Sequence, residues 1–543
     1  MKLSQLILLA LIVCLAALLR LYKLSDIPPG VNRDEASIGY TAYSLLQTGR
    51  DEYGRDVPVS FESFGDWKLP LYIYTTIPFV KIFGLTELAV RLPSALAGIS
   101  GVLAVYMLAF LLFRSLSLAL ISAAVLAISP WHIHLSRVES EANIAVALIV
   151  VGSIQFVSAI QNKSFKKLLL ASILFAATYY TYHGNHIFTT LFVIGLGVIY
   201  KKEIVNISRW WVAVGTGLIF IALILSVTLR ADSTKISGIS IFGDPTVVHY
   251  NIELPRLLHA STDSFIARLI HNRVTYGAVA MYQNYLKSYG PQFLFIKGGD
   301  NSAHNIDGYG NLHLVEAPLL LIGLYWLVTR RKNNSSKLIL WWIAIGAVAA
   351  AITKDAPHTN RMFAVVPALA IATAGAIVTV ILHIQKRWKI IVTFLIVAGY
   401  AVCMVLYLER YFVHFPKSEA ANWGYAYKLL TPILYSSENK TKNIIMTHPE
   451  KSPYMYILFY SGFSPALYQK EAKRYPISRD GFTDIYGFGR FSFRPIDWSA
   501  DVIAHNALLV ADPAEIPDSL KKTNYQEILL PSGTPIFGIV SLP

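Results

Sequence analysis

Two adjacent carboxylates, Asp34 and Glu35, stand at a position suited to removing a proton from a substrate. They follow a turn rich in proline and glycine, residues 28–30, and open a stretch whose apolar residues recur at helical spacing. The pattern predicts an amphipathic surface helix that is capped by Asn32 and carries both acids in its first turn. A carboxylate there either stabilises the helix dipole or acts as a general base, and the spacing leaves both interpretations open.

A second charged segment, residues 132–143, contains Arg137 and two further candidate acids, Glu139 and Glu141. Glu141 lies four residues after Arg137, which is also the spacing of a simple ion pair on a helix surface. The sequence shows no phosphate-binding P-loop, no His-Glu-x-x-His pattern and no calcium-loop spacing. We therefore expect no tightly bound structural metal and no required cofactor, while a divalent cation stays open.

The elements that position these residues are expected to be membrane helices. Of 543 residues, 54% are hydrophobic and only 15% are charged, and the mean hydropathy is +0.48, so the chain has too little polar surface for a water-soluble globule. Disorder, a collagen-like fibre and a disulfide scaffold are excluded. Apolar runs of about 20 residues predict eleven transmembrane helices. They lie near residues 4–22, 92–112, 118–133, 143–160, 168–182, 187–200, 210–228, 314–329, 338–353, 362–384 and 390–408.

The formal net charge of +14 follows from this topology without a nucleic-acid partner. If the N-terminus is cytoplasmic, the cytoplasmic ends and connections hold fifteen basic residues and one acid, Glu203, so the positive-inside rule accounts for the whole excess. A cleavable signal peptide is the competing interpretation of the first run. That run continues to about Tyr22, longer than a signal core, and ends in basic and aromatic anchors. We expect a multi-pass protein of the cell membrane.

Three long segments are then extracytoplasmic: residues 23–91, 229–313 and 409–543. The second is too long for a simple connector and predicts two or three short helices around 262–289, followed by a glycine-rich flap at 298–310. The third changes to strand-length apolar runs. It predicts an α/β domain, residues 409–543, beside a transmembrane domain, residues 1–408. Strands are expected at 443–447, 507–510, 527–530 and 536–540, and helices near 417–431, 452–461 and 514–521.

Five motifs in a fixed order along the chain carry a family resemblance. They are the acidic pair after the first span, Gly65-Asp66-Trp67-Lys68-Leu69-Pro70 before an aromatic helix, Arg91-Leu92-Pro93-Ser94-Ala95-Leu96-Ala97-Gly98 at the second span, and the outer loops at 132–143 and 357–361. Over roughly residues 1–400 the chain resembles the glycosyltransferase family 39 and 83 superfamily, which includes protein O-mannosyltransferases and bacterial aminoarabinose transferases. Leu69 departs from the second proline of many members.

The resemblance implies a polytopic α-helical protein with the C-type glycosyltransferase fold, juxtamembrane helices and an extracytoplasmic α/β domain. It implies transfer of a sugar from a polyprenyl-phosphate donor, held with membrane lipid, to an unknown protein, lipid or glycan acceptor on the outer side. Asp34, or else Glu35, would take the proton of the attacking hydroxyl, and inversion would follow. Glu139 and Glu141 are secondary candidates for an acid.

The leaving phosphate needs positive charge instead of a general acid. The candidates in outer segments are Lys68, Arg91, Arg137, His358 and Arg361, of which Lys68 and Arg361 lead. Arg91 has a structural alternative as an anchor at the start of the second span. Other functions stay open: a transporter of lipid-linked glycans, a noncatalytic sugar-binding membrane protein, or a ligase for lipid-linked polymers. A transporter usually carries charges deep in its spans, and the predicted spans have almost none.

Overall fold

The structure is a computed structural model that describes residues 2–231, 239–259, 265–478, 483–503, 505–522 and 524–543. The chain forms two compact units, each described here by itself. The first, the helical unit, consists of Met1–Arg20, Leu96–Ser136 and Ser140–Tyr407. The second, the sheet unit, consists of Leu21–Ala95, Arg137–Glu139 and Leu408–Pro543. The first outer segment, residues 21–95, therefore packs with the C-terminal residues. The predicted division into domains 1–408 and 409–543 had assigned that segment to the transmembrane domain.

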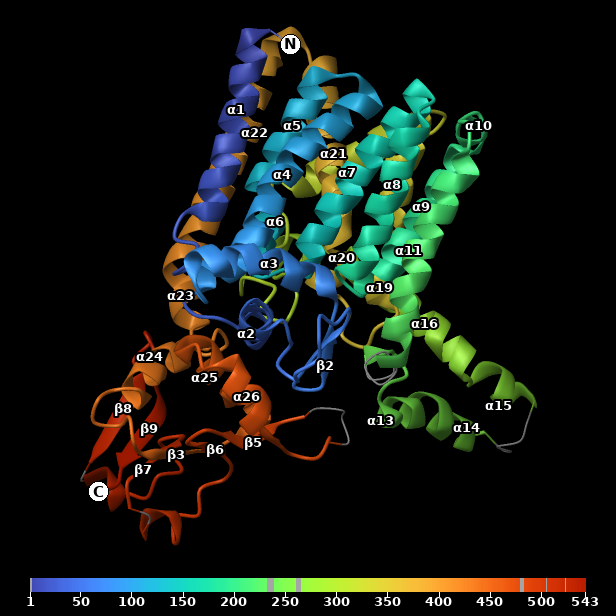
Figure 1. The fold of residues 1–543 in the computed structure, drawn as a ribbon. Helices are drawn as coiled ribbons and strands as arrows, with labels where there is room; N and C mark the ends of the chain where they lie inside the picture. The colour runs from blue at the N-terminus through green and yellow to red at the C-terminus, as the bar shows by residue number, and fades with distance from the viewer. Residues whose placement is uncertain (1, 232–238, 260–264, 479–482, 504, 523) are drawn as a thin grey trace. The chain divides into compact units, whose positions relative to one another are not determined.

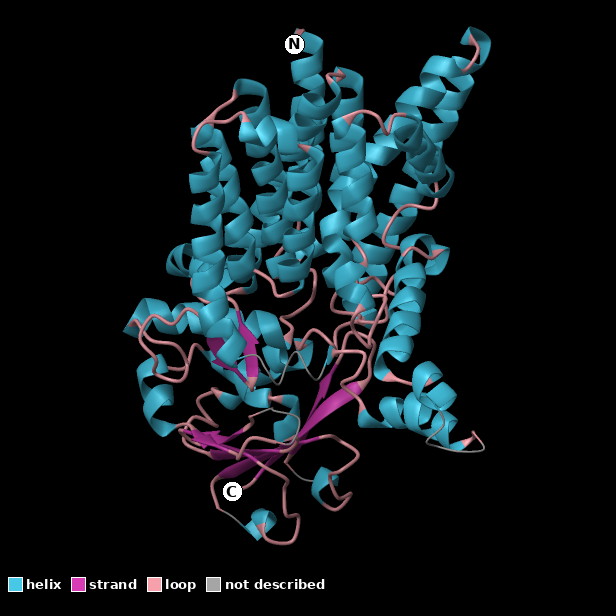
Figure 2. Cartoon of the chain, turned by 90° about the vertical axis from the view of Figure 1, so that its right-hand side faces the viewer, coloured by secondary structure: helices cyan, strands magenta, loops and turns pink. Residues whose placement is uncertain are grey.

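Long apolar helices make up most of the helical unit (Figures 1 and 2). In chain order they are α1 (Leu3–Leu21), α4 (Glu87–Phe113), α5 (Leu116–Ile128), α6 (Pro130–Arg137), α7 (Glu141–Asn162), α8 (Phe165–Ala177), α9 (Gly184–Ile199), α10 (Lys201–Val205), α11 (Trp210–Ala231), α17 (Glu316–Thr329), α18 (Asn334–Ile345), α19 (Val348–Ala351), α20 (Thr359–Met362), α21 (Val366–His383) and α22 (Lys386–Glu409). Helices α1, α4 and α22 each run across the boundary between the units.

Among the described residues, seven helical stretches are long and apolar enough to span a membrane. The number is eight if α5 and α6, which meet at an angle of 56°, form one broken span. Polytopic helical architecture is therefore confirmed. The other three predicted spans fall on α8, α9 and α17, which have 13, 16 and 14 residues. Those helices are shorter than the roughly 20 residues that cross a bilayer without tilt or thinning. Length and composition therefore support seven or eight spans, and the count of eleven stays a prediction.

Small residues allow the membrane helices to pack closely. Helix α21 is buried along most of its length and is rich in alanine. A Cβ atom on Gly323 of α17 would overlap the backbone of Ala372 in α21, and one on Gly375 would overlap the Trp326 indole. The two helices therefore touch backbone to backbone, as is common between membrane helices that have no water to expel.

Short helices follow α11 in the segment that was predicted to contain two or three of them. They are α13 (Pro245–Val248), η2 (His249–Glu253), α14 (Leu254–Leu257), α15 (Phe265–Ile270), α16 (Arg273–Ser288) and η3 (Gln292–Ile296). The predicted start of these helices, at 262, lies outside the described residues. The glycine-rich stretch 298–310 contains no helix or strand, as a predicted loop should.

The sheet unit begins with the helix that carries the acidic pair, α2 (Arg33–Thr48), followed by the hairpin β1 (Phe61–Ser63) and β2 (Asp66–Lys68) and the proline-led α3 (Pro70–Phe83). The helix was predicted, but its place on the bilayer surface is wrong. Ten of its sixteen residues are buried, because α3, α25 (Pro453–Ser461) and α26 (Pro465–Glu471) pack around it. The closeness is visible at Gly39, where a Cβ atom would strike the Phe459 ring.

The C-terminal part forms a seven-stranded mixed sheet in the order β4, β5, β6, β3, β7, β9, β8. The strands are β3 (Asn443–Met446), β4 (Lys473–Arg474), β5 (Ile485–Phe488), β6 (Phe491–Phe493), β7 (Ala507–Ala511), β8 (Tyr525–Leu529) and β9 (Pro535–Ser541). Strand β3 is parallel to both neighbours, whereas β9 pairs antiparallel with β7 and β8. Ile445, Leu509 and Val540 are buried in a core on one face of the sheet.

The four predicted strands all form, at positions shifted by at most two residues at either end. The helices α23 (Phe415–Ser418), α24 (Tyr425–Leu434) and α25 match two of the three predicted helical segments. The third, at 514–521, is wrong: the described chain there has only a short 3-10 helix, η8 (Leu520–Lys522). Asp512 accepts a hydrogen bond from the Ala514 N–H, and Pro513 and Pro517 restrict the backbone, so turns replace the helix.

Candidate functional site

The helix that carries the acidic pair starts with the predicted cap. Asn32 has an extended backbone, and its side-chain oxygen accepts a hydrogen bond from the Glu35 N–H at 2.8 Å. Asp34 and Glu35 therefore lie in the first turn of α2, where the helix dipole favours negative charge. Consecutive helical residues point about 100° apart, which gives the two carboxylates different surroundings.

Glu35 is completely buried and bound on both oxygens. The Arg91 Nε and Nη2 atoms donate to its two carboxylate oxygens at 3.0 and 2.9 Å, and the Glu139 backbone N–H donates at 2.9 Å. Arg91 is also fully buried and makes five hydrogen bonds. Besides the two to Glu35, these reach the carbonyl oxygens of Leu24, Pro28 and Gly30. The pair thus fixes the turn before α2.

Asp34 has the opposite environment. Its side chain is 53% exposed, and one carboxylate oxygen lies 3.0 Å from the Lys68 Nζ. The Lys68 side chain is only 6% exposed and lies 3.3 Å from a second carboxylate, Asp66. The ammonium also lies 4.3 Å from the centre of the Phe64 ring. A buried cation therefore sits between two carboxylates, one of which faces solvent.

Electrostatics keeps the exposed carboxylate ionised. Desolvation raises the pKa of Asp34, but the Lys68 ammonium and the nearby Arg33 outweigh that effect, and the pKa is lowered from its ordinary value. At neutral pH Asp34 is therefore charged and has its lone pairs available for a proton. Of the predicted acids, Asp34 is the one whose carboxylate is exposed and also has a buried lysine as its partner.

Arg137, another predicted phosphate ligand, is fully buried. Its Nη2 donates to the carbonyl oxygens of Lys23 and Ile27 at 3.3 and 3.1 Å, and its Nε donates to the Tyr411 hydroxyl at 3.2 Å. The aromatic ring of Tyr411 lies 5.3 Å from the guanidinium. Like Arg91, Arg137 holds backbone together around the segment before α2. Glu141 begins α7 whereas Arg137 ends α6, so the two do not lie on one helical surface.

The last two predicted ligands, His358 and Arg361, lie together in the helical unit. The Arg361 guanidinium is paired with Asp355 and donates to the Thr353 hydroxyl at 2.8 Å. His358 caps α20: its Nδ1 accepts from the Arg361 N–H at 3.4 Å, and its Nε2 lies 3.7 Å from Asp355. Both side chains are 12% exposed, whereas Asp355 is 47% exposed.

This cluster borders a cavity of about 480 Å³. Lys354 and His304 also line it, and the rings of His304 and His358 are 5.4 Å apart. Burial, together with the charge of Arg361, lowers the pKa of His358 well below its ordinary value, and Asp355 opposes this only in part. His358 is therefore neutral at pH 7. Lys354 is the cation that lines the cavity, and Arg361 is paired with the lining residue Asp355.

An apolar groove of about 390 Å³ lies between α8, α9 and α11 in the same unit. Tyr179 and Thr190 are polar residues of its lining. Three residues beyond Tyr179, the hydroxyl of Tyr182 interacts with Arg361. The short segment 179–182 thus connects the groove to the Arg361 cluster.

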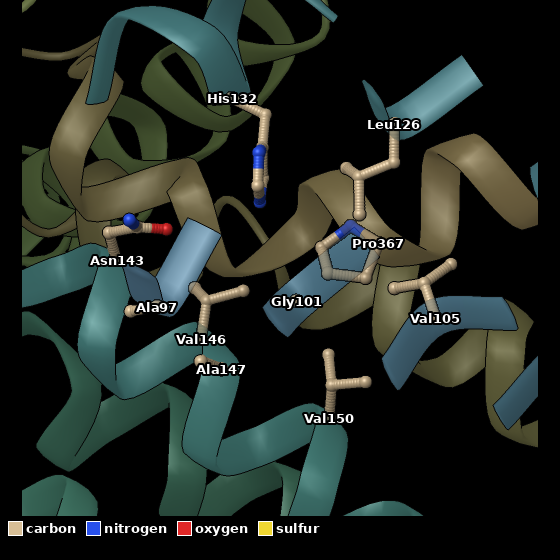
Figure 3. A pocket seen from close by; sticks show the side chains of 10 residues that line it. All are labelled: Ala97, Gly101, Val105, Leu126, His132, Asn143, Val146, Ala147, Val150 and Pro367. Carbon is tan, nitrogen blue, oxygen red and sulfur yellow. The ribbon is translucent and has the colours of Figure 1, made fainter. Parts of the chain in front are cut away.

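A further crevice inside the bundle is a packing feature. Figure 3 shows His132 and Asn143 among apolar side chains, and the crevice has essentially no internal volume. The buried Arg20 donates to the His132 Nδ1 at 2.7 Å and to the Ala127 carbonyl at 3.0 Å. These residues join α1 to the bend between α5 and α6.

The sequence interpretation gave no functional role to Asp66, Asp355, Lys354 or Tyr182. Asp66 and Lys68 alternate on one short strand, which places their side chains on the same face. The two-residue spacing of Asp66 and Lys68 on a strand could therefore have predicted this contact from the sequence. Asp355 precedes His358 by three residues, but only the fold of this loop, with the Arg361 side chain folded back on it, makes it a partner.

Within the described ranges, no group of three or more His, Cys, Asp or Glu side chains is arranged to hold a metal ion. Asp34 and Asp66 approach the same ammonium, which already supplies the positive charge between them.

Solved structures with a similar fold are membrane enzymes. ArnT from Cupriavidus metallidurans bound to undecaprenyl phosphate shares 11% identity, with a TM-score of 0.53 over 99% of each chain. The archaeal oligosaccharyltransferase AglB from Archaeoglobus fulgidus, in complex with an inhibitory peptide and a dolichol-phosphate, shares 12% identity. Its TM-score is 0.51, over 99% of this chain and 74% of that one. At these identities the likeness establishes the fold.

Sequence comparison finds a family match over part of the chain. None of the curated proteins matches the chain. Residues 68–228 match the family described as dolichyl-phosphate-mannose-protein mannosyltransferase. The matched residues include Lys68, Arg91, Arg137 and the secondary acids. The resemblance to this family of membrane glycosyltransferases, which the motifs predicted, is therefore confirmed, and the chain has the ArnT-like C-type fold.

Proposed function

We propose that the protein transfers a sugar from a polyprenyl-phosphate donor to an acceptor on the extracytoplasmic side of the membrane, with inversion at the anomeric carbon. One observation carries the proposal: Asp34 is a half-exposed carboxylate kept ionised by the buried Lys68. The family match over residues 68–228 and the ArnT-like fold support the reaction class. The lipid phosphates bound to ArnT and AglB support the type of donor.

Asp34 acts as the general base in this proposal. It takes the proton of the acceptor hydroxyl while the oxygen attacks the anomeric carbon, and the bond from that carbon to the phosphate oxygen breaks. The bond's electron pair leaves with the phosphate, so no general acid is needed. Glu35 is unsuited to this role because Arg91 occupies both of its oxygens in a fully buried pair.

Lys68 is best assigned as the residue that positions and ionises Asp34. Two carboxylates already neighbour its ammonium, so its charge is directed to Asp34 and Asp66. Arg361 and Lys354, beside the 480 Å³ cavity, are the better candidates for the donor phosphate. A guanidinium binds phosphate through paired hydrogen bonds. Arg91 and Arg137 have their donors directed to backbone and side-chain oxygens of the sheet unit.

The groove between α8, α9 and α11 suits the carrier tail. It is apolar, it faces helices of membrane-spanning composition, and segment 179–182 links it to Arg361. A polyprenyl chain cannot leave the bilayer, so its phosphate must be processed at the headgroup level.

For the orientation in the membrane, we propose eleven spans with the N-terminus in the cytoplasm. Helix α10, which carries Lys201 and Lys202, lies at the same end of the helical unit as the N-terminus (Figure 1). The short α13–α16 helices lie toward the opposite end. Placing the basic end in the cytoplasm follows the positive-inside rule.

The test supplies the purified protein, in lipid nanodiscs, with a panel of polyprenyl-phosphate sugars and a panel of hydroxyl-bearing peptide, lipid and glycan acceptors, and measures release of polyprenyl phosphate. The expected result is release from at least one donor by the wild type and by Asp66→Asn, which keeps the contact of Lys68 with Asp34. Asp34→Asn should lose it. A protein that moves donors across vesicle membranes without cleaving any would instead be a transporter, and the proposal would be rejected.

A further inference from the structure

The helical unit contains a second polar cavity. It has a volume of about 340 Å³ and lies between the loop after α11, helix α16 and Lys354. Ligand pockets range from about 300 to 1,000 Å³, so this cavity has room for one or two sugar rings. Lys354 lines both this cavity and the 480 Å³ cavity beside Arg361. The two cavities are therefore neighbours.

Backbone pairing holds the walls of the second cavity in place. Ser240 and Thr353 form an isolated antiparallel bridge, and the Lys354 N–H donates to the carbonyl oxygen of Ile239 at 3.0 Å. Asn284 of α16 donates its side-chain amide to the Thr353 carbonyl at 3.0 Å. The loop and the helix are thus both fastened to the segment that precedes His358, so donor and second-cavity residues share one support.

The polar lining of the second cavity consists of one carboxylate, one ammonium and two side-chain amides. Asp244, Asn251, Gln283 and Lys354 supply hydrogen-bond donors and acceptors. The Thr246 hydrogen bonds, and to a smaller extent the Lys354 charge, lower the pKa of Asp244, so this carboxylate offsets the charge of Lys354. A lining of this kind favours a neutral ligand with many hydroxyl groups over a phosphate or a nucleotide.

The remaining wall is apolar and aromatic. Ile241, Val247 and Val279 lie there with the ring of Tyr276, which packs against Phe242 with ring centres 5.9 Å apart. A sugar ring presents hydroxyl groups at its edge and C–H groups on its face, so it needs both kinds of wall. A lipid tail would leave the charged side chains without partners, which is costly.

We propose that this cavity binds a carbohydrate acceptor, so that the enzyme extends a glycan. The inference rests on the proposed function, since it names the acceptor for the same transfer. The neighbouring position across Lys354 would bring an acceptor sugar next to the donor phosphate site. A peptide acceptor is the competing class, and the experiment decides between the two.

The test uses two tryptophan substitutions on α16. Ala280→Trp fills the cavity, because Ala280 lines it, whereas Ala278→Trp, on the same helix at an exposed position outside the lining, is the matched control. Binding of methyl mannoside, methyl glucoside, N-acetylglucosamine and maltose to the full-length protein in nanodiscs is measured by saturation-transfer NMR. We expect the wild type and Ala278→Trp to bind at least one probe, and Ala280→Trp to bind it at least tenfold more weakly.

Equal binding by all three proteins, or no binding by the wild type, overturns the inference. Binding of a short serine- and threonine-containing peptide that only Ala280→Trp loses would assign the cavity to a peptide and also overturn it. Donor cleavage by water, measured without acceptor, is the separate readout for the proposed function. It should be unchanged in the control Ala278→Trp, and its absence from the wild type would reject glycosyl transfer whatever the sugars do.

Discussion

Exchanging each carboxylate of the acidic pair for its amide should separate catalysis from folding. Asp34→Asn should remain folded and lose transfer activity, because an amide cannot accept the proton of the acceptor. Glu35→Gln should lose stability first, because it leaves the Arg91 guanidinium buried without its counter-charge. The two substitutions are chemically identical and lie one residue apart, so each is the control for the other.

The structure sets the expected magnitudes. Loss of a general base costs about 10² to 10⁴ in rate, or roughly 3 to 5 kcal/mol of transition-state stabilisation. The half-exposed Asp34 contributes an ion pair to stability that is worth about 1 kcal/mol or less. Breaking a fully buried pair such as Glu35 with Arg91 costs about 3 to 5 kcal/mol of folding free energy. Asp34→Asn should therefore change the rate more than the stability, and Glu35→Gln the reverse.

The assay combines release of polyprenyl phosphate with the thermal unfolding midpoint of each purified variant. Donor binding, measured with a short-chain polyprenyl phosphate, should survive in Asp34→Asn. A Glu35→Gln protein that unfolds at the wild-type temperature but has no activity, beside an active Asp34→Asn, would make Glu35 the base and refute the assignment. If both variants are active and only stability falls, the acids serve the helix alone.

Three other predictions concern the base, a turn and the topology. Lys68→Ala should raise the pKa of Asp34, whose ionised form is the active one. The acid limb of the pH–rate profile should therefore shift to higher pH. Gly30→Ala should lower the thermal unfolding midpoint, because its Cβ would overlap a backbone carbonyl oxygen. In the control Gly49→Ala the new Cβ would meet no atom, so this variant measures only the backbone strain of a positive φ angle. In a cysteine-free chain, single cysteines in 440–520 should be labelled from outside and those in 330–337 only from the cytoplasm.

The sequence predicted the helices and strands that are determined by interactions between residues close in the chain. Asn32 as a cap, Pro70 at the start of an aromatic helix, and the strands β7 and β9 were all readable, because capping and alternation act within a few residues. Strands β5 and β6 were missed. They have four and three residues and depend on pairing with each other across a tight turn, so their own sequence carries a weak signal.

Partners distant in the chain could not be predicted. Besides the nearby α3, the helices α25 and α26, more than 400 residues later, bury α2, so its apolar spacing was consistent with a bilayer surface as well as a protein interior. Separation along the chain, although much smaller here, also hid the difference between the two acids. Asp34 meets Lys68 and Glu35 meets Arg91, and no pattern within residues 28–46 distinguishes them.

The acidic pair poses an electrostatic problem that the fold solves twice, in different ways. Two neighbouring carboxylates repel each other and raise each other's pKa unless each has a cation. Glu35 receives Arg91 inside the protein, where neither group meets water, and this pair is fixed. Asp34 receives Lys68, whose ammonium is buried while the carboxylate itself remains 53% exposed. Only this second carboxylate is both ionised and accessible to an incoming hydroxyl group. The permanently paired neighbour holds the backbone of the first helical turn, and the exposed one is left to do the chemistry.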